Sequence, residues 1–510
     1  MAQILLTHSY FLRFDPKEHR AMMPYPPLGM LYAASFLRRA GFSVAAHDVM
    51  FASQEQEIAQ SISRHHPDVV VIYDDQFNYL TKMCLTRMRQ AAFSLATIAK
   101  TMGCRVVMFS SDATDHLEEY FSHGADFVII GEAEETLKEL VVYLLRSSGT
   151  PLDSIRGLAF KSGSDFFRTA PRNVLEDLDI LPFPAWDLLD LKLYRESWNR
   201  KHGYFSLNMV TTRGCPFHCN WCAKPIYGQV YHSRSPENVV EEMLMLRDRA
   251  NPDHLWFADD IFGLKPGWIG RFDELVQSQK AMIPFKCLSR VDLLLKEDNV
   301  RHLKSAGCRT VWVGAESGSQ KILDAMEKGT KVEQIYEASS LLHQHGISVG
   351  FFLQYGYPGE THEDIEKTLR MVRECAPDEI GISVSYPLPG TKFYDQVQRE
   401  LARKQNWVDS GDLDMMFQGT FSPEFYRVLH RFTHKKFRVW QGNAILRDTL
   451  KNPRNLDVAT LERLARSAYH ALTVPRLRTK LNAMASHSRR ETRDLTAGTV
   501  ISELSGKEKE

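Results

Sequence analysis

Short apolar runs separated by amphipathic stretches are the feature that most limits what this chain can fold into. Asp68–Tyr73 reads DVVVIY and Arg105–Ser110 reads RVVMFS, with no alternation of polar and apolar residues. Strands of this kind are buried on both faces, as in parallel sheets covered by helices. Because such strands and helices follow one another in turn, the sequence predicts an α/β protein.

The first series of strands predicts a doubly wound parallel sheet over residues 1–145. Ligands of such sheets bind beyond the carboxyl ends of the strands. The expected strands are Gln3–Thr7, Ser43–Asp48, Asp68–Tyr73, Arg105–Ser110 and Asp126–Ile130.

A second series predicts a partial (β/α)6 TIM barrel over residues 201–400, with its chemistry on the loops after the strands. Its expected strands are Ser206–Thr212, Leu255–Asp259, Phe285–Ser289, Thr310–Glu316, Ser348–Tyr355 and Glu379–Tyr386. Residues 146–200 read as a linker with a short hairpin around Gly157–Arg168. Residues 401–490 predict a helical extension, with helices at Pro423–Gln441, Leu456–Ala471 and Pro475–His487. Residues 491–510 are polar, and we expect a disordered tail there.

Composition excludes several classes of protein. Of the 510 residues, 44% are hydrophobic and 25% charged, which is typical of globular domains. No apolar run reaches about 18 residues, so we expect no membrane span. The N-terminus has no basic segment followed by a cleavage site, so we expect a cytoplasmic protein. Lys plus Arg and Asp plus Glu are both 63, and the neutral total gives no electrostatic argument for nucleic-acid binding.

Three of the eight cysteines lie within eight residues, in the segment RGCPFHCNWC at Arg213–Cys222. The thiolates of Cys215, Cys219 and Cys222 lie so close in sequence that they can fold only around a small metal object. A structural zinc site normally has four ligands, and His218 is a possible fourth one. The alternative is a [4Fe–4S] cluster with one iron left open. The segment directly follows the first barrel strand, on the face where barrel enzymes work, which favours the cluster.

The cysteines, with Trp221 before the last one, resemble the Cys-x3-Cys-x-aromatic-Cys motif of the radical S-adenosylmethionine (SAM) superfamily. The resemblance implies a [4Fe–4S] cluster that binds SAM and cleaves it, after one-electron reduction, to a 5′-deoxyadenosyl radical. It also implies an electron donor such as flavodoxin or ferredoxin.

Further residues at the ends of the barrel strands match SAM contacts of that family. Asp259 or Asp260 would accept from the SAM amine, Arg290 would bind its carboxylate, and Glu316 would accept from the ribose hydroxyls. Each also has a structural interpretation, such as a helix cap for the aspartates and an ion pair for Arg290.

The order of the two domains resembles cobalamin-dependent radical SAM enzymes. The matching segments are PPLG at Pro26–Gly29 and GEAEET at Gly131–Thr136. The predicted cobalamin contacts are Pro27, Gly29, Ser110, Gly131 and Glu132. The first loop lacks the Asp-x-His-x-x-Gly motif of many cobalamin domains. We therefore interpret His8 and His19 as solvated loop histidines, and a domain that binds no cobalamin stays an alternative.

The branch that the sequence resembles contains the anaerobic magnesium-protoporphyrin IX monomethyl ester cyclase and radical SAM methyltransferases. The resemblance implies hydrogen abstraction from an unactivated carbon, followed by methyl transfer from methylcobalamin or by oxidative cyclisation. A tetrapyrrole, a lipid or a secondary-metabolite intermediate would be the substrate. Two alternatives remain at this point: a radical SAM enzyme without cobalamin that rearranges or epimerises its substrate, and a zinc-stabilised module that binds RNA or protein.

Overall fold

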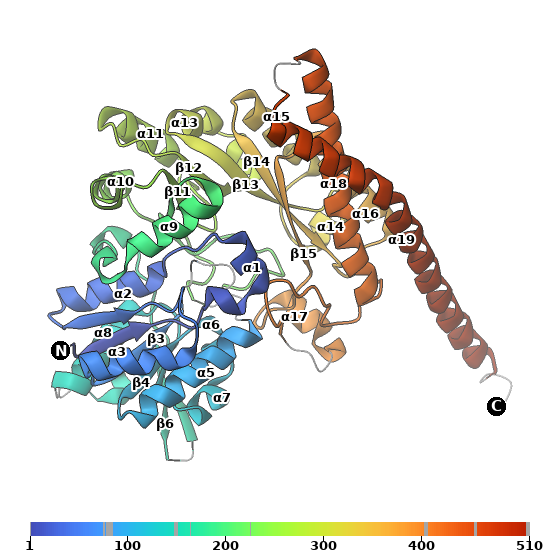
Figure 1. Ribbon diagram of the computed structural model, residues 1–510. Helices are drawn as coiled ribbons and strands as arrows, with labels where there is room; N and C mark the ends of the chain where they lie inside the picture. The colour runs from blue at the N-terminus through green and yellow to red at the C-terminus, as the bar shows by residue number, and fades with distance from the viewer. Residues whose placement is uncertain are drawn as a thin grey trace.

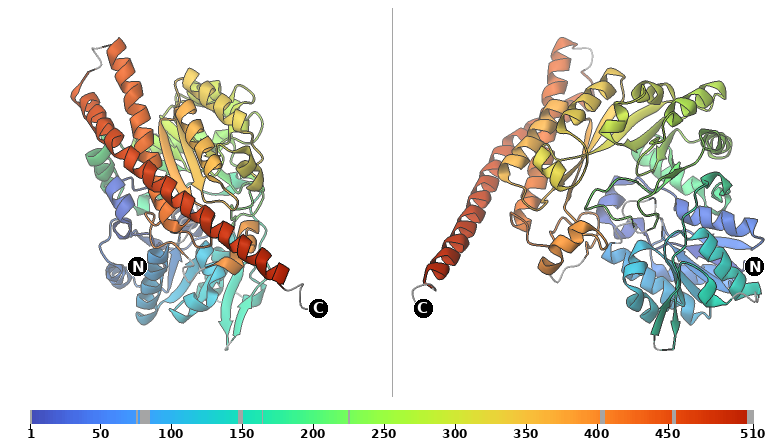
Figure 2. Two further views of the ribbon diagram at one scale, coloured as in Figure 1. Left: turned by 90° about the vertical axis from the view of Figure 1, so that its right-hand side faces the viewer. Right: turned by 180° about the vertical axis from the view of Figure 1, so that it is seen from behind.

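Two parallel β-sheets lie next to each other in the computed structural model of this chain (Figure 1). The first is formed by the N-terminal part of the chain and the second by the central part, and a pair of long helices packs beside the second sheet. Figure 2 shows the same arrangement from two other sides. The structure describes residues 2–74, 77, 85–146, 151–163, 165–224, 226–401, 406–452 and 456–505, with side chains up to residue 486.

The N-terminal sheet has the strand order β2-β1-β3-β4-β5-β6-β7, and its first five strands are parallel. The direction of strand order reverses between β1 and β3, and such a switch point opens a crevice at the carboxyl edge. The parallel strands are β1 (Ile4–Thr7), β2 (Val44–His47), β3 (Val69–Tyr73), β4 (Arg105–Phe109) and β5 (Phe127–Ile129). The doubly wound sheet that the sequence predicts is confirmed.

Two separate apolar cores cover the faces of this sheet. In β3, Val69, Val71 and Tyr73 belong to one core, whereas Val70 and Ile72 belong to the other. Successive side chains of a strand point to opposite faces, so a run without polar residues needs a cover on both sides. Helices α2 (Leu28–Arg39) and α8 (Glu134–Arg146) pack on the first face, and α3 (Ile58–His65) and α5 (Thr86–Thr101) on the second.

The predicted hairpin in the linker is present, but it belongs to the N-terminal sheet. Strand β6 (Leu158–Ser162) pairs antiparallel with β5, and β7 (Asp165–Arg168) pairs antiparallel with β6. Ala159 lies in the same core as Val70 and Ile72 of β3, which explains why the hairpin extends the sheet. The sequence also predicts a helix near Leu80–Met102 and a turn at 147–149. Residues 80–84 of that helix, with Cys84, and the turn fall outside the described residues.

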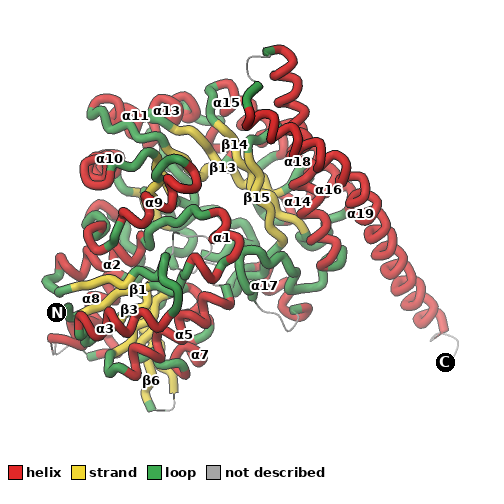
Figure 3. The backbone as a smooth tube through the Cα atoms, viewed as in Figure 1, coloured by secondary structure: helices red, strands yellow, loops and turns green. Residues whose placement is uncertain are grey.

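The second sheet is an open half-barrel of six parallel strands in the order β15-β14-β13-β12-β11-β8. Consecutive strands are neighbours throughout, as expected for successive β/α units. Helices α10 (Pro236–Ala250), α11 (Trp268–Ser278), α13 (Asn299–Ser305), α15 (Val332–Gln344) and α16 (His362–Cys375) cover its outer face (Figure 3). The strands are β8 (Ser206–Met209), β11 (His254–Phe257), β12 (Phe285–Ser289), β13 (Cys308–Glu316), β14 (Ser348–Tyr355) and β15 (Glu379–Val384).

The C-terminal helices differ from the prediction in number and length. Helix α18 (Pro423–Lys451) is followed by a single helix α19 (Val458–Ser505), which continues through Pro475. The two helices pack antiparallel, with Lys435 Nζ 3.0 Å from Thr473 Oγ1. This packing holds both sides of Pro475 on one axis, although proline removes a helical hydrogen bond. No helix in the described part of the chain is long and apolar enough to cross a bilayer.

Candidate active site

The cysteine segment leaves the first strand of the half-barrel as a short hairpin. Strand β9 (Thr212–Arg213) pairs antiparallel with β10 (His232–Ser233), and the three cysteines lie in the loop between them, each half-buried. Gly214 adopts φ +79°, and a Cβ there would lie 2.2 Å from the carbonyl oxygen of Val230. Glycine is therefore required for the turn that leads into Cys215.

Asn220, inside the cysteine segment, ties this loop to the rest of the edge. Its side chain donates to the carbonyl of Ala325 at 2.7 Å and accepts from the hydroxyl of Tyr357 at 3.0 Å. Its backbone N–H donates to Met326, and its carbonyl accepts from Phe393. Asn220 is not among the site residues predicted from the sequence. Its place between two cysteines was the available signal, because a loop that holds a metal cluster must be fixed by hydrogen bonds.

The donor set, three thiolates in one loop, fits an iron–sulfur cluster. Among the described residues, no group of three or more His, Cys, Asp or Glu side chains is placed as the ligands of one metal ion. The thiolates of a [4Fe–4S] cluster bind different irons, and so they need not converge on one point. Two buried polar atoms at the same edge, Trp221 Nε1 and Ser289 Oγ, have no protein partner. Such atoms fit an edge that binds a polar cofactor.

Asp259 and Asp260 have different surroundings. Asp259 is 2% exposed and accepts hydrogen bonds from the backbone N–H and the hydroxyl of both Thr211 and Thr212, at 2.7–3.0 Å. Burial raises its pKa to about 6, against the effect of these donors. The bonds also explain why β8 ends at Met209 and not at the predicted Thr212. Asp260 is exposed. Burial raises the pKa of Cys215, and the negative charge of Asp260 adds to this rise. Of the two, Asp260 is therefore the better placed to meet a ligand.

Arg290 lies directly behind the cysteine loop. Its guanidinium carbon is 3.5 Å from the ring centre of Phe217, and its Nε donates to Asp292 at 3.0 Å. Nη2 donates to the carbonyl of Lys328 at 3.3 Å. The contact with Asp292 is an ion pair, as in the structural alternative for Arg290, but the arginine is only 6% exposed, so the pair does not lie at the open surface.

Glu316 is paired with a lysine that the sequence analysis missed. Lys328 Nζ lies 2.9 Å from Glu316 Oε1, and both side chains are nearly buried. Burial alone would lower the pKa of Lys328, but Glu316 and Cys219 raise it, so the lysine is a cation beside the cysteine loop. Glu316 adopts φ +55°, a conformation that is uncommon for non-glycine residues.

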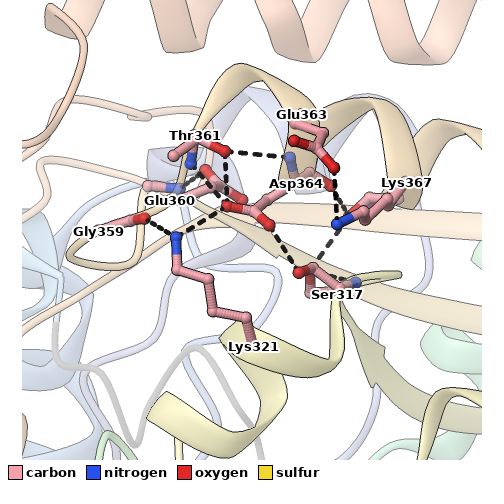
Figure 4. Close-up of polar contacts among 11 residues, drawn as sticks. Ser317, Lys321, Gly359, Glu360, Thr361, Glu363, Asp364 and Lys367 are labelled. Atoms are coloured by element: carbon pink, nitrogen blue, oxygen red, sulfur yellow. Dashed lines mark hydrogen bonds and ion pairs between the residues drawn. The ribbon is translucent and has the colours of Figure 1, made fainter.

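A polar cluster joins the loops that follow β13 and β14 (Figure 4). Asp364 accepts from the hydroxyls of Ser319 and Thr361 and from Lys321 Nζ, and these bonds lower its pKa to about 2 although burial acts to raise it. Glu360 lies nearby and is fully buried, with one oxygen bonded to the N–H of Gly356 and the other without a partner. Burial raises the pKa of Glu360 to about 8. This carboxyl is therefore largely protonated at neutral pH.

Arg213, two residues before the first cysteine, connects the two sheets. It is 3% exposed and forms ion pairs with Glu132 and Glu134, which follow β5 of the N-terminal sheet; Nη2 lies 2.5 Å from Glu134 Oε1. The guanidinium also lies 5.3 Å from the ring centre of Tyr227. Glu132, a predicted cobalamin contact, thus holds the cysteine loop. Gly131, another predicted cobalamin contact, lies next to Glu132 in the loop after β5.

The carboxyl edge of the N-terminal sheet has an unfilled acceptor at its switch point. Asp74 follows β3, and its Oδ1 accepts from the N–H and hydroxyl of Ser9, both at 2.8 Å. Its Oδ2 is buried and has no hydrogen-bond partner among the residues that the structure describes. Ser110 instead bonds the N–H of Ala113 and caps α6 (Ser111–Asp115). An orphaned oxygen at a switch point fits a bound polar cofactor.

The remaining predicted cobalamin contacts, and the two histidines, are also placed. Pro27 and Gly29 are buried at the start of α2. His8 is 2% exposed and lies 2.9 Å from Asp48 Oδ1, so the prediction of a solvated loop histidine was wrong for this residue. The aspartate at the end of the neighbouring strand supplies its partner. His19 is exposed as predicted, but it lies in helix α1 (Pro16–Ala21) and not in a loop.

Comparisons with known proteins agree with this geometry. The model of the radical SAM superfamily matches residues 209–372, and that of the B12 binding domain matches residues 20–141. An uncharacterized methyltransferase of Pyrococcus horikoshii is 29% identical over 75% of this chain and 81% of its own length. The anaerobic magnesium-protoporphyrin IX monomethyl ester cyclase of Synechocystis sp. is 24% identical over 74% of this chain and 73% of its own length.

A solved structure shows the same fold over nearly the whole chain. The cobalamin-dependent SAM radical enzyme OxsB with aqua-cobalamin bound matches with a TM-score of 0.70 over 94% of this chain and 72% of that one, at 16% identity. The half-barrel and its cysteine motif thus belong to the radical SAM superfamily. With its N-terminal B12-binding domain, the protein is a cobalamin-binding radical SAM enzyme, whose cofactors are a [4Fe–4S] cluster, SAM and cobalamin.

Proposed function

We propose that this enzyme methylates an unactivated carbon of a small molecule. When bound, the cluster and SAM supply a 5′-deoxyadenosyl radical, and cobalamin supplies a methyl group. The observation that supports a combined use of both is the ion pair of Arg213 with Glu132 and Glu134. This ion pair fixes the loop after β5, at the carboxyl edge of the N-terminal sheet, to Arg213, the last residue before the cysteine loop.

The chain's own residues would position the reactants. Cys215, Cys219 and Cys222 would hold the cluster, and Trp221 Nε1 and Ser289 Oγ are free to donate to a ligand beside it. Asp260 would accept from the SAM amine, while Lys328 and Glu316 would bind the carboxylate or the ribose. Arg290 would act mainly by stacking on Phe217 and keeping the loop in place.

On the corrinoid side, Asp74, Gly131 and the buried start of α2 at Pro27 and Gly29 would contact the cofactor. His8 is 2% exposed and its Nε2 is bonded to Asp48, and we assign it no role as a cobalt ligand. We expect a one-electron donor of the flavodoxin or ferredoxin class.

Methyl transfer is favoured over cyclisation by the relatives. The P. horikoshii relative, named as a methyltransferase, is more similar to this chain than the Synechocystis cyclase, at 29% against 24% identity. The two reactions consume SAM differently. Methyl transfer produces S-adenosylhomocysteine and 5′-deoxyadenosine together, whereas cyclisation needs only the radical.

The test uses protein purified and reconstituted without oxygen, with cobalamin supplied. Iron and corrinoid content are measured first, and roughly four irons and one corrinoid per chain are expected. The protein is then incubated with reductant, SAM carrying a deuterated methyl group, and small-molecule extracts of the source cells. Equal amounts of S-adenosylhomocysteine and 5′-deoxyadenosine, with a product heavier by the labelled methyl group, support the proposal.

Other outcomes contradict it in distinct ways. 5′-Deoxyadenosine with an oxidised, unlabelled product identifies a cyclase. A full complement of iron without corrinoid identifies SAM-only radical chemistry.

A further inference from the structure

The inner face of the half-barrel is not filled with side chains from its own strands. In β14, Phe351 and Leu353 are 0% and 1% exposed and belong to the core under the outer helices. Phe352 between them is 39% exposed, although β14 has a strand on both sides. Alternate residues of a strand point to opposite faces, so Phe352 lies on the inner face and is accessible there.

Two aromatic rings form a platform on this inner face. The centre of the Trp312 ring, in β13, lies 4.7 Å from that of Phe352. A Cβ at Gly350 would lie 2.3 Å from the Trp312 indole, and one at Gly381 would lie 3.3 Å from Phe352 and 3.4 Å from Trp312. Gly350 lies on β14, next to the strand of Trp312, and Gly381 lies on β15, the strand beyond it. Without side chains, these two positions let the indole lie flat against the sheet.

The upper end of the platform adjoins the proposed SAM site. Phe352 is in register with Gly314 of β13. A Cβ at Gly314 would lie 2.5 Å from both Glu316 Oε1 and Lys328 Nζ, the pair described above. A molecule on the platform would therefore lie next to the residues that we assign to SAM.

The lower end carries a cation without an acidic partner. Lys286, in β12, is half-buried and its Nζ lies 5.2 Å from the ring centre of Trp256 and 5.3 Å from that of Tyr25. In the part of the chain that the structure describes, no carboxylate lies within ion-pair distance of this amine. Burial, and then the charge of Lys286, lower the pKa of the nearby His254 to about 3, so this histidine is neutral.

We infer that this inner face binds the substrate, and that the substrate has a flat conjugated ring system with a carboxylate on a short arm. The ring would stack on Trp312 and Phe352, and the carboxylate would pair with Lys286. Lys286 is in register with Thr310, two residues before Trp312, so ring and carboxylate would be roughly 8 Å apart. The inference rests on the proposed function, since it names the substrate class of the same site.

The test measures binding of a probe to the reconstituted holoenzyme. The probe is 1-pyrenebutyrate, which has a flat ring system and a carboxylate on a three-carbon arm, and its neutral match is 1-pyrenebutanol. Equilibrium dialysis without oxygen gives both dissociation constants and is insensitive to the colour of the cofactors. We expect the acid to bind on the order of tenfold more tightly than the alcohol, as a charge-assisted bond in a half-buried site provides.

Variants separate the two parts of the site. Lys286→Met should weaken binding of the acid about tenfold and leave the alcohol unchanged, whereas Lys286→Arg should keep the preference for the acid. Gly350→Ala should displace the indole and weaken both probes together. Lys296→Met, at an exposed lysine after α12 (Val291–Leu294), is the matched control and should change neither.

Iron and corrinoid content are measured on every variant, so that a loss of cofactor is recognised as a failure of the proposed function. With both cofactors present, equal affinity for acid and alcohol, or an unchanged preference in Lys286→Met, would overturn the inference. Failure of the acid to bind at all would overturn it too.

Discussion

The two sheets of this enzyme differ in which part of their surface is open to a ligand. In the N-terminal sheet, both faces are covered, and every residue of β3 is 0% exposed. The strand order reverses between β1 and β3, so the switch point at Ser9 and Asp74 is the place where a ligand can enter. In the half-barrel, strand order is sequential and helices cover the outer face, so the inner face is accessible, as the exposed Phe352 shows.

The difference teaches that the same βα units can hold a cofactor at an edge or a substrate on a face, depending on strand order and on closure. Arg213 joins the two arrangements. It places the loop after β5 of one sheet against the loop after β8 of the other. Each of the following predictions changes one side of this comparison or the contact between them.

The largest effect is expected from Cys219→Ala. The variant should lose essentially all of its cluster iron, because two thiolates cannot hold the cluster. Corrinoid content should be unchanged, because the B12-binding domain lies in the other sheet. Metal analysis and the visible spectrum after reconstitution measure both. Cys375→Ala, at a buried cysteine of α16, is the control and should keep its iron. Simultaneous loss of the corrinoid would show that the two edges are not independent.

Arg213→Met should destabilise the contact between the sheets by about 3 kcal/mol or more, because two carboxylates would remain buried without their cation. Urea denaturation without oxygen measures the change in the free energy of unfolding. Adding Glu132→Gln and Glu134→Gln should recover a large part of the loss, because neutral amides need no cation. If the triple variant is less stable than the single one, the ion pairs are not the main source of the effect.

Glu360 predicts a pH dependence on the barrel side. Its pKa is about 8 in the folded protein and 4.5 when exposed, so the folded state holds a proton that the unfolded state has lost between these values. Stability should therefore fall as pH rises, by about 2 kcal/mol between pH 6 and pH 8. In Glu360→Gln, which keeps an acceptor for the N–H of Gly356, this contribution should disappear. Urea titrations of both proteins at the two pH values give the comparison, and parallel pH profiles would contradict it.

The smallest effect concerns the N-terminal edge. Asp74→Ala should weaken corrinoid binding about tenfold, since one hydrogen-bond acceptor for the corrinoid is removed. Iron content should stay constant. Spectroscopic titration with hydroxocobalamin measures the affinity, and Asp68→Ala, at the opposite end of β3, is the control. An unchanged affinity would remove Asp74 from the corrinoid site.

The strands and the cysteine motif could be predicted because their signals are local. The limits of β12 and β14 agree with the prediction at both ends, since apolar runs of this length and their neighbours define a buried strand. The spacing of Cys215, Cys219 and Cys222 is likewise contained in eight residues. In contrast, β8 ends three residues early because Asp259, 48 residues from Thr211, binds the donors that would have continued it.

The sequence by itself determined the α/β class, the order of its two sheets and the three cysteines that we propose as cluster ligands, because hydrophobic period and cysteine spacing act within a few residues. The tertiary structure decided which polar residues meet. Glu132 pairs with Arg213 across 81 positions, Lys328 with Glu316, and Trp312 lies over glycines of two other strands. Such contacts depend on how buried charges and ring shapes are satisfied when distant segments pack, and no local pattern encodes that choice.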